Sequence, residues 1–249
     1  MARICIITPI VSEGFRDNGP LMAAVSATDA VEQKFLKYGP ASVESAVDEV
    51  LAGPGVIDAA LAAEAEGYEA LVIDCMLDPA LEAARESVSI PVIGCGEAGF
   101  RAAAKLGRFS VITVLQRQER AFRELAARHG LSDSLASVRG VGISVLELEQ
   151  DRQASIAAST SEAIEAANKD GAESIIFGCT GMLGFAAPVA RALGWEPERV
   201  IDPLPNAVSA AHAAAANHYD KSAFPAPESK EIRGFGQWHA LSSMFAVKS

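Results

Sequence analysis

The sequence lacks an excess of positive charge, since 21 Lys+Arg face 32 Asp+Glu in 249 residues and the formal net charge is −11. Nucleic-acid backbones and anionic membranes attract basic patches, so we expect neither as a partner. The longest uncharged apolar stretch, residues 174–190, contains three glycines and Pro188, which excludes it as a membrane-spanning helix. The opening segment MARICIITPI has the pattern of a strand rather than of a basic and then apolar leader. We therefore expect a cytoplasmic location.

Cysteine and histidine are scarce and widely spaced. The four cysteines form no C-x-x-C pair, and the four histidines lie far from them in sequence; these residues are Cys5, Cys75, Cys95, Cys179, His129, His212, His218 and His239. Four cysteines in a chain of this length, without a leader, favour reduced thiols over a disulfide framework. The spacing also makes a metal site improbable, so we expect neither a metal nor a cofactor.

Half of the residues are hydrophobic and 21% are charged, which is ordinary for a globular protein and excludes a disordered chain. Short apolar runs alternate with Ala-rich amphipathic stretches, a pattern typical of parallel βαβ units in an α/β fold. We predict strands over 3–8, 70–74, 91–93, 109–114, 142–146, 174–177 and 199–201. We predict helices over 42–51, 56–66, 79–86, 97–106, 118–129, 154–169, 182–193 and 204–218. Ligands are expected at the carboxyl ends of the strands.

An internal repeat indicates that two similar halves make up this fold. The run ALVIDC, ending at Cys75, aligns with SIIFGC, ending at Cys179. Upstream, Thr8 precedes Cys75 by 67 residues and Thr113 precedes Cys179 by 66, and the segments 91–94 and 199–202 align downstream. Three anchors in the same order place one cysteine at the same structural position in each half.

The repeat also predicts the domain organisation. We expect a first α/β half from 1–93 plus 203–220, because the helix after Asp202 is predicted to pack back onto that half. The second half is 94–202. Beyond it, residues 221–249 mix prolines, charges and isolated aromatics, which predicts an extended arm that uses Trp238 and Phe245 as anchors on its own domain or on a neighbouring subunit.

The two matched cysteines are the candidate catalytic residues. A cysteine that follows a parallel strand and opens a helix lies where backbone N–H groups and the helix dipole favour the thiolate. Asp78 is predicted to cap a helix that begins at Pro79, and the small residues after Cys179 leave N–H groups open to a ligand. Two thiols facing one cleft can remove a proton from one side of a carbon and return one from the other side. Cys5 and Cys95 are interpreted as small buried hydrophobic residues.

A competing motif is Gly94-Cys-Gly96-Glu-Ala-Gly99, a G-x-G-x-x-G pattern between a predicted strand and a predicted helix. Such a pattern indicates a dinucleotide site, and it would make the protein an NAD-dependent dehydrogenase. The acidic residue expected after the next strand is missing, because the sequence continues as Leu115-Gln116-Arg117. The alternative interpretation is a tight turn between strand and helix.

Several motifs together resemble the aspartate/glutamate/hydantoin racemase superfamily, above all its hydantoin and allantoin racemase branch, over roughly residues 3–215. They are GPASVE at 39–44, CMLDPAL at 75–81, PVIGCGE at 91–97, RFSVIT at 108–113, DGAE at 170–173 and GCTGM at 178–182. The resemblance implies a cofactor-independent homo-oligomer of two flavodoxin-like halves, with the active site in the cleft between them. It implies Cys75 and Cys179 as the acid/base pair, Thr180 and Gly181 as backbone donors, and Gly39, Pro40 and Ser42 in a loop beside the cleft.

The chain departs from this family at two places. Family members commonly carry Asn-Pro-Asn-Thr after the first strand, where this chain has Thr8-Pro9-Ile10-Val11-Ser12, so Thr8 and Ser12 are the expected hydroxyl contacts. Thr113 and Val114 replace the Thr-Thr pair of the family, so only Thr113 is expected to bind substrate there. Met76, beside Cys75, completes the expected substrate-binding residues. Arg16 is either an anion contact or an exposed loop charge.

The leading hypothesis is a racemase or epimerase of a small carbon acid, such as a 5-substituted hydantoin or an amino-acid-like ureide. The small molecule is the only class of partner expected besides a second copy of the chain. Within the superfamily, a cis–trans isomerase or a decarboxylase stays open, although the second cysteine disfavours decarboxylation. From other classes, the dehydrogenase and a two-lobed binding or sensor protein without chemistry also stay open.

Overall fold

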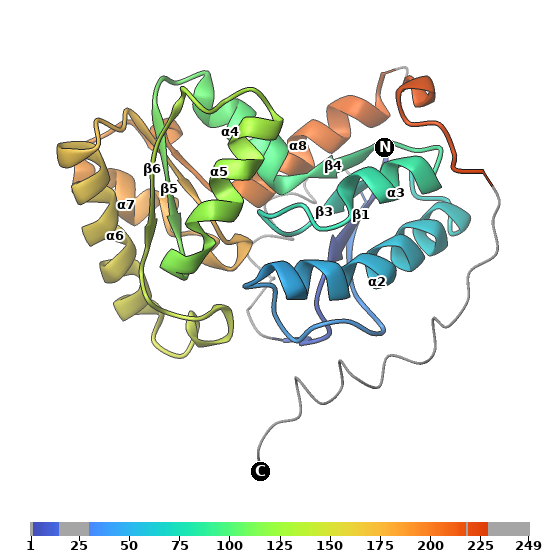
Figure 1. Cartoon of the computed structure of the whole chain (residues 1–249), viewed down its shortest axis with the longest axis horizontal. Coiled ribbons are helices and arrows are strands. Elements are labelled where there is room, and N and C mark those ends of the chain that lie inside the picture. Colours follow the sequence, from blue (N-terminus) through green and yellow to red (C-terminus); the bar gives the residue numbers. More distant parts are fainter. Residues whose placement is uncertain (1, 15–29, 218, 229–249) are drawn as a thin grey trace, which may run out of the picture.

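The computed structural model describes residues 2–14, 30–217 and 219–228. The protein consists of two α/β halves side by side (Figure 1), each built on a four-stranded sheet. The first sheet has the order β2-β1-β3-β4, and the second has β6-β5-β7-β8. Every pairing is parallel. Within the described residues the strands are β1 (Arg3–Thr8), β2 (Ala30–Phe35), β3 (Ala70–Ile73), β4 (Val92–Gly94), β5 (Phe109–Thr113), β6 (Leu135–Gly140), β7 (Ser174–Phe177) and β8 (Val200–Ile201).

Helices cover both sheets, as expected for parallel strands. They are α2 (Ala46–Ala65), α3 (Leu81–Ser87), α4 (Cys95–Ala104), α5 (Glu119–Arg128), α6 (Arg152–Lys169), α7 (Ala186–Leu193) and α8 (Pro203–Ala215). The last helix, α8, packs against β1, β3 and β4 of the first sheet and against α4, and it lies beside β4 in Figure 1. The predicted fold class, two α/β halves with parallel sheets, is confirmed, and the repeated strand order explains the sequence repeat.

The central strands are buried along their whole length, because helices cover both of their faces. All four residues of β3 and all five of β5 are buried. Continuous apolar runs such as ALVI and FSVIT bury every side chain, which stabilises the sheet by roughly 25 cal/mol for each Å² of apolar surface removed from water. These strands hold the chain segments at their carboxyl ends in fixed positions.

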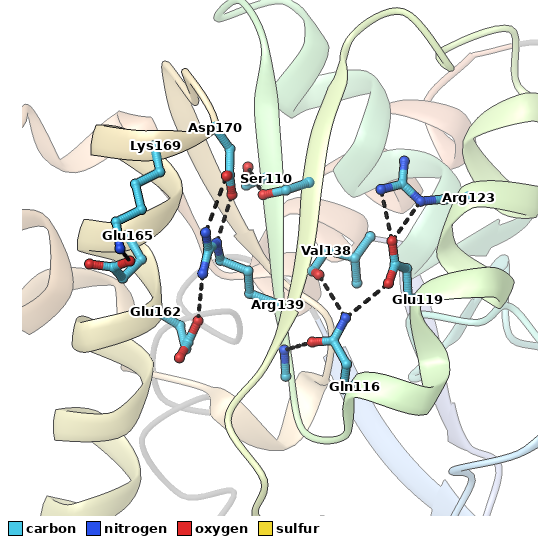
Figure 2. Close-up of polar contacts among 12 residues, drawn as sticks. Ser110, Gln116, Glu119, Arg123, Val138, Arg139, Glu162, Glu165, Lys169 and Asp170 are labelled. Atoms are coloured by element: carbon cyan, nitrogen blue, oxygen red, sulfur yellow. Dashed lines mark hydrogen bonds and ion pairs between the residues drawn. The ribbon is translucent and has the colours of Figure 1, made fainter.

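Two edge strands differ from the prediction. β2 and β6 were not predicted, and residues 142–146, predicted as a strand, form a loop and the short 3-10 turn Val145–Glu147 instead. Both missed strands carry polar or charged residues, because an edge strand is covered less completely. Figure 2 shows the guanidinium of Arg139 on β6 between Asp170 and Glu162 of the α6 region, with Nε 2.6 Å from Asp170 Oδ2. The Gln116 amide accepts from Gly140 N–H and donates to the Val138 carbonyl, which fixes the strand from its other side.

Helix α2 runs without interruption past Pro54, where two helices over 42–51 and 56–66 were predicted. A proline inside a helix costs roughly 3 kcal/mol or more, so packing must offset that cost. Ala52, Gly55 and Val56 are buried. A Cβ atom at Gly55 would lie 2.5 Å from the Tyr38 carbonyl oxygen, so the glycine allows the helix to lie directly against that segment. Tertiary packing therefore decides the conformation around Pro54.

The chain beyond α8 returns to the first half. The Lys221 ammonium donates to the Glu86 carbonyl at 3.0 Å, and the Arg85 guanidinium lies 5.1 Å from the centre of the Phe224 ring. Trp238, Phe245 and Arg16 lie outside the described residues, so the predicted roles of the arm and of Arg16 stay predictions, as do the domain limits 1–93 plus 203–220, 94–202 and 221–249. None of the helices in the described parts of the chain is long and apolar enough to cross a membrane.

Candidate active site

A cavity lies between the two halves, at the carboxyl ends of β1, β3, β5 and β7. It contains about 450 Å³ of empty space, part of it open to solvent. Its walls come from both halves and consist of Thr8, Pro9, Ile10, Val43, Asp74, Cys75, Met76, Leu77, Val114, Gln118, Val145, Gly178, Cys179, Thr180 and Gly181. The carboxyl ends of parallel strands are the usual place for a ligand in such folds.

Cys75 lies in the turn after β3 and lines this cavity. Burial raises the pKa of its thiol well above the ordinary value, and the charges of Cys179, Asp78 and Glu49 raise it further. The backbone N–H of Leu77 is hydrogen-bonded to the thiol and acts in the opposite direction. Desolvation outweighs this hydrogen bond, so the net shift in pKa at Cys75 is opposite to the predicted stabilisation of a thiolate. Burial therefore favours the neutral thiol of Cys75 over its thiolate.

Cys179 occupies the matching position after β7 and caps the 3-10 turn Thr180–Met182. The backbone N–H of Gly181 donates to Cys179 Sγ at 3.3 Å. A donor directed at sulfur stabilises its negative charge, so this sulfur has a feature suited to a thiolate. The preceding Gly178 allows close packing, since a Cβ atom there would lie 2.6 Å from Thr113 Cβ.

The two cysteine turns are joined by a direct contact. The Thr180 hydroxyl donates to the Asp74 carbonyl at 3.3 Å, so the residues that adjoin the two cysteines touch across the halves. Glu44 of the first half makes a second connection, because it accepts from Val145 N–H at 2.9 Å and forms an ion pair with Arg117 at 3.2 Å. These contacts hold the two sides of the cavity together.

The predicted site residues divide into two groups. Those that line the cavity are Thr8, Met76, Cys75, Cys179, Thr180 and Gly181, whereas Ser12, Gly39, Pro40, Ser42 and Thr113 are not part of its walls. The Pro40 carbonyl accepts from Val11 N–H at 3.0 Å, so that loop supports the segment that includes Ile10. Thr113 donates its hydroxyl to Gln118 at 2.7 Å. Five of the predicted residues thus lie around the cavity rather than in its walls.

Sequence reasoning missed Asp74, Gln118 and most of the apolar wall. Asp74 directly follows β3, a position that the rule about strand ends already favours. Its carboxylate accepts from the Thr8 hydroxyl at 2.7 Å, and that hydroxyl accepts from the Gln33 amide at 2.7 Å. Gln118 lies beyond β5 in a turn whose course the sequence does not predict, so no signal marked it.

Asp78 binds a different helix from the one predicted. Its carboxylate accepts from the N–H groups of Gly96 and Glu97 at 2.8 and 2.7 Å, so it caps α4. The helix expected from Pro79 begins at Leu81 instead, after Ala80 in the left-handed conformation, and the Ala80 side chain provides no cap. Burial raises the pKa of Asp78 to about 7. Asp78 therefore connects the turn that carries Cys75 to the start of α4.

The glycine pattern after β4 is explained by these contacts. A Cβ atom at Gly94 would lie 2.5 Å from the Asp78 carboxylate, one at Gly96 would lie 2.3 Å from the Met76 carbonyl, and one at Gly99 would lie 2.4 Å from Ile176 Cδ1. The N–H groups that a dinucleotide phosphate would need at the start of α4 are bound to Asp78. The motif serves packing around the Cys75 turn.

A second, partly buried aspartate holds the turn after Cys179. Asp202 accepts from Gly184 N–H at 3.1 Å, and burial raises its pKa to about 6. The Arg152 guanidinium donates to the Leu183 carbonyl at 2.6 Å in the same turn. Each cysteine turn is thus fixed by a carboxylate, buried at Asp78 and partly buried at Asp202. Among the residues that the structure describes, no group of three or more His, Cys, Asp or Glu side chains is arranged to hold a metal ion.

These features define a class: two-lobed α/β proteins with one cysteine from each lobe in a shared cavity. The sequence profile of the Asp/Glu/hydantoin racemase family matches residues 22–211, and this chain belongs to that family. A hydantoin racemase of Pseudomonas sp. (strain NS671) is 41% identical over 159 residues, which is 64% of each chain and just under two thirds of that enzyme. A hydantoin racemase of Paenarthrobacter aurescens is 36% identical over 186 residues, 74% of this chain and 78% of that one.

A solved structure gives the same assignment. The allantoin racemase from Klebsiella pneumoniae superposes with a TM-score of 0.84 at 30% identity, covering 95% of this chain and 98% of that one. The relatives are named as racemases, which are isomerases, and the agreement extends over nearly the whole fold.

Proposed function

We propose that this protein is a cofactor-independent racemase of a small carbon acid, with 5-substituted hydantoins as the first candidates. The observation that carries the proposal is the placement of Cys75 and Cys179, one from each half, in the walls of one cavity. The family membership and the similarity to hydantoin racemases support the same reaction class.

The proposed reaction moves one proton at the carbon between N1 and the C4 carbonyl of the hydantoin ring. A thiolate on one side removes this proton and becomes a thiol, and the electron pair of the C–H bond moves onto the carbonyl oxygen. A thiol on the other side then donates its proton to the opposite face of the same carbon and becomes a thiolate. Atoms and charge balance, and the stereocentre is inverted without an external reagent.

The electrostatics of the cavity favour one starting arrangement of the proton on the two sulfurs. Desolvation favours the protonated form of the Cys75 thiol, which suits this residue to the role of proton donor. Cys179, whose sulfur accepts from Gly181 N–H, is the base for the first enantiomer. The opposite enantiomer requires the reverse arrangement. Because each thiolate raises the pKa of the other sulfur, the site favours having one proton on the pair.

The rest of the cavity suits a small ligand with an apolar substituent. Its apolar side chains include Ile10, Val43, Leu77, Val114 and Val145. Such walls favour burial of an alkyl or aryl substituent at roughly 25 cal/mol for each Å² and exclude water from the carbanion-like intermediate.

Proton exchange during turnover tests this proposal. In D₂O, one enantiomer of a 5-substituted hydantoin is expected to lose optical rotation while it gains one deuterium at C5. The variants Cys75→Ser and Cys179→Ser should each lower kcat for racemisation by at least about 10³, because a serine hydroxyl is a far weaker acid and its alkoxide is not populated. The matched control is Cys5→Ala, which removes a sulfur buried in β1 and should keep activity. Full turnover in either serine variant would rule out the two-thiol mechanism.

The same experiment separates the alternatives. A decarboxylase would release CO₂ from a substituted malonate, and a cis–trans isomerase would convert an unsaturated diacid; both would leave the hydantoin stereocentre unchanged. A binding or sensor protein would be stabilised by ligand without deuterium incorporation. The homo-oligomeric state and the cytoplasmic location stay predictions.

A further inference from the structure

The cavity between the halves has few side chains with an N–H or O–H group left for a ligand. The Thr8 hydroxyl donates to Asp74 Oδ2 at 2.7 Å, and the Thr180 hydroxyl donates to the Asp74 carbonyl at 3.3 Å. Each hydroxyl has one hydrogen, so both donors are used within the protein. Apart from the two cysteines, Gln118 is then the remaining polar side chain with N–H groups in the described walls.

The orientation of the Gln118 amide is fixed by Thr113. The Thr113 hydroxyl donates to Gln118 Oε1 at 2.7 Å, and both residues are buried, with only 4% of Gln118 exposed. Since the oxygen of the amide faces Thr113, the Nε2 group is the part of the amide that is available for the cavity. The backbone N–H of Gln118 donates to the Leu115 carbonyl at 3.0 Å, so the turn that carries this side chain is itself fixed.

The charge of the walls narrows the ligand class. Among the wall residues in the described ranges there is no Lys, Arg or His, and the charged side chain is the acid Asp74. A ligand carboxylate would therefore lie beside an acidic side chain in these described walls, which opposes its transfer from water. A neutral ligand with carbonyl oxygens meets an amide donor instead, and its transfer from water costs less free energy than that of a charged carboxylate.

We propose that Gln118 is a substrate-binding residue: its Nε2 group donates a hydrogen bond to a ring carbonyl oxygen of a neutral cyclic amide, and Thr113 acts as its positioning residue. The proposal rests on the proposed racemase function, because it concerns the same cavity. What it adds to that function is the side chain that recognises the ring carbonyl.

Binding of a ligand that cannot react tests this assignment directly. The probe is 5,5-dimethylhydantoin, which has both ring carbonyls but no C5 hydrogen. Calorimetric titration should show about tenfold weaker binding to Gln118→Met than to the unmodified protein, because one neutral hydrogen bond is lost. The matched control is Gln116→Met in the same turn, whose amide binds Val138 and Gly140 (Figure 2) and does not line the cavity. The Kd of Gln116→Met for the probe should be unchanged, and the variant should unfold in a single cooperative thermal transition.

A double-mutant cycle separates binding from a merely structural role. Thr113→Val should weaken binding of 5,5-dimethylhydantoin by a few-fold, since the amide loses its fixed orientation. In the Gln118→Met background the same change should have no further effect on Kd, because Thr113 acts through the glutamine. Equal losses in both backgrounds would overturn the positioning role of Thr113.

The outcomes distinguish the two proposals. An unchanged Kd in Gln118→Met, with racemisation intact, would overturn the role of Gln118 and leave the racemase function standing. No binding of the probe and no deuterium exchange in the unmodified protein would overturn the racemase function itself. Titration with aspartate and glutamate should give no binding up to millimolar concentrations. Binding of either as tightly as the probe would overturn the preference for uncharged ligands.

Discussion

Cys75 differs from an exposed cysteine in one property that alkylation can measure. Its pKa is raised by burial and by the charge of Cys179. The rate of modification by iodoacetamide should therefore rise only at alkaline pH, with a midpoint above the ordinary value of about 8.5 for a free thiol. In Cys179→Ser the midpoint should fall, because the neighbouring negative charge is removed. Mass spectrometry of the modified peptides would report the rate at each pH.

The remaining thiols provide the internal control. Cys5 and Cys95 are 0% exposed, and burial raises the pKa of Cys5 to about 12, so neither should react in the folded protein. A midpoint for Cys75 below about 8 would contradict the dominant role of desolvation and would reverse the proposed starting arrangement of the two sulfurs.

For individual residues, the sequence predicts the positions of the two cysteines well and the side chains around them poorly. Cys75 and Cys179 stand out because a repeat marks them both. Gln118 is unmarked, since its position depends on the course of the turn after β5 and on the Thr113 hydroxyl. Asp78 was assigned to the nearest helix in sequence, but its carboxylate lies closer to the N–H groups of α4, which only the packed turn reveals.

Among the elements, the junction of the Cys75 turn with α4 is the most tightly packed part of the site. A Cβ atom at Gly96 would lie 2.3 Å from the Met76 carbonyl oxygen, and backbone cannot move away as a flexible side chain can. Gly96→Ala should therefore displace the turn and cost roughly 1–3 kcal/mol of stability. Because that turn carries Cys75, kcat for racemisation should also fall at temperatures where the variant is still folded.

Gly53→Ala in α2 is the matched control for this substitution. The nearest atom to a Cβ there is Ala80 Cβ at 3.7 Å, an ordinary contact, and alanine is favoured over glycine inside a helix. This variant should be neutral or more stable by about 0.5–1 kcal/mol and keep its activity. Equal activity and thermal stability in Gly96→Ala and the unmodified protein would show that the glycine pattern has some purpose other than packing.

The elements that sequence patterns miss share a physical cause. Apolar runs identify strands that helices cover on both faces, so β1, β3, β5 and β7 follow from the sequence. The edge strands β2 and β6 are stabilised partly by polar contacts such as the Arg139–Asp170 pair, which no periodicity encodes. Pro54 normally ends a helix, yet packing of Gly55 against Tyr38 keeps α2 continuous.

For the whole molecule, the two-half organisation follows from the repeat alone. Each half repeats the same strand order, so equivalent strand ends carry the two cysteines into a common cavity. What the repeat cannot give is the set of contacts that join the halves. Thr180 to Asp74 and Glu44 to Val145 are single hydrogen bonds between segments about 100 residues apart, and they exist only once the two halves are packed together.

The two aspartates that fix the cysteine turns, Asp78 and Asp202, should give the whole molecule a distinctive pH dependence. The pKa is about 7 for Asp78 and about 6 for Asp202, whereas an unfolded aspartate titrates near 3.9. Between pH 4 and 7 the folded protein therefore holds more protons than the unfolded chain. Its free energy of unfolding should fall as the pH rises through this window, by on the order of several kcal/mol in total, and level off above pH 7.

Urea unfolding measures how the free energy of unfolding depends on pH. The unmodified protein is compared with the double variant Asp78→Asn/Asp202→Asn, since asparagine stays neutral at every pH. The double variant should gain stability relative to the unmodified protein as the pH rises from 4 to 7. Asp170→Asn is a control of opposite sign, because Arg139 lowers the pKa of Asp170, so its contribution is lost only as the pH falls below about 4. The contradicting outcome is a difference in the free energy of unfolding between the double variant and the unmodified protein that stays constant from pH 4 to 7. It would mean that both aspartates are ionised throughout this range. The hydrogen bonds from the N–H groups of α4 and of Gly184 would then stabilise the carboxylates more than burial destabilises them.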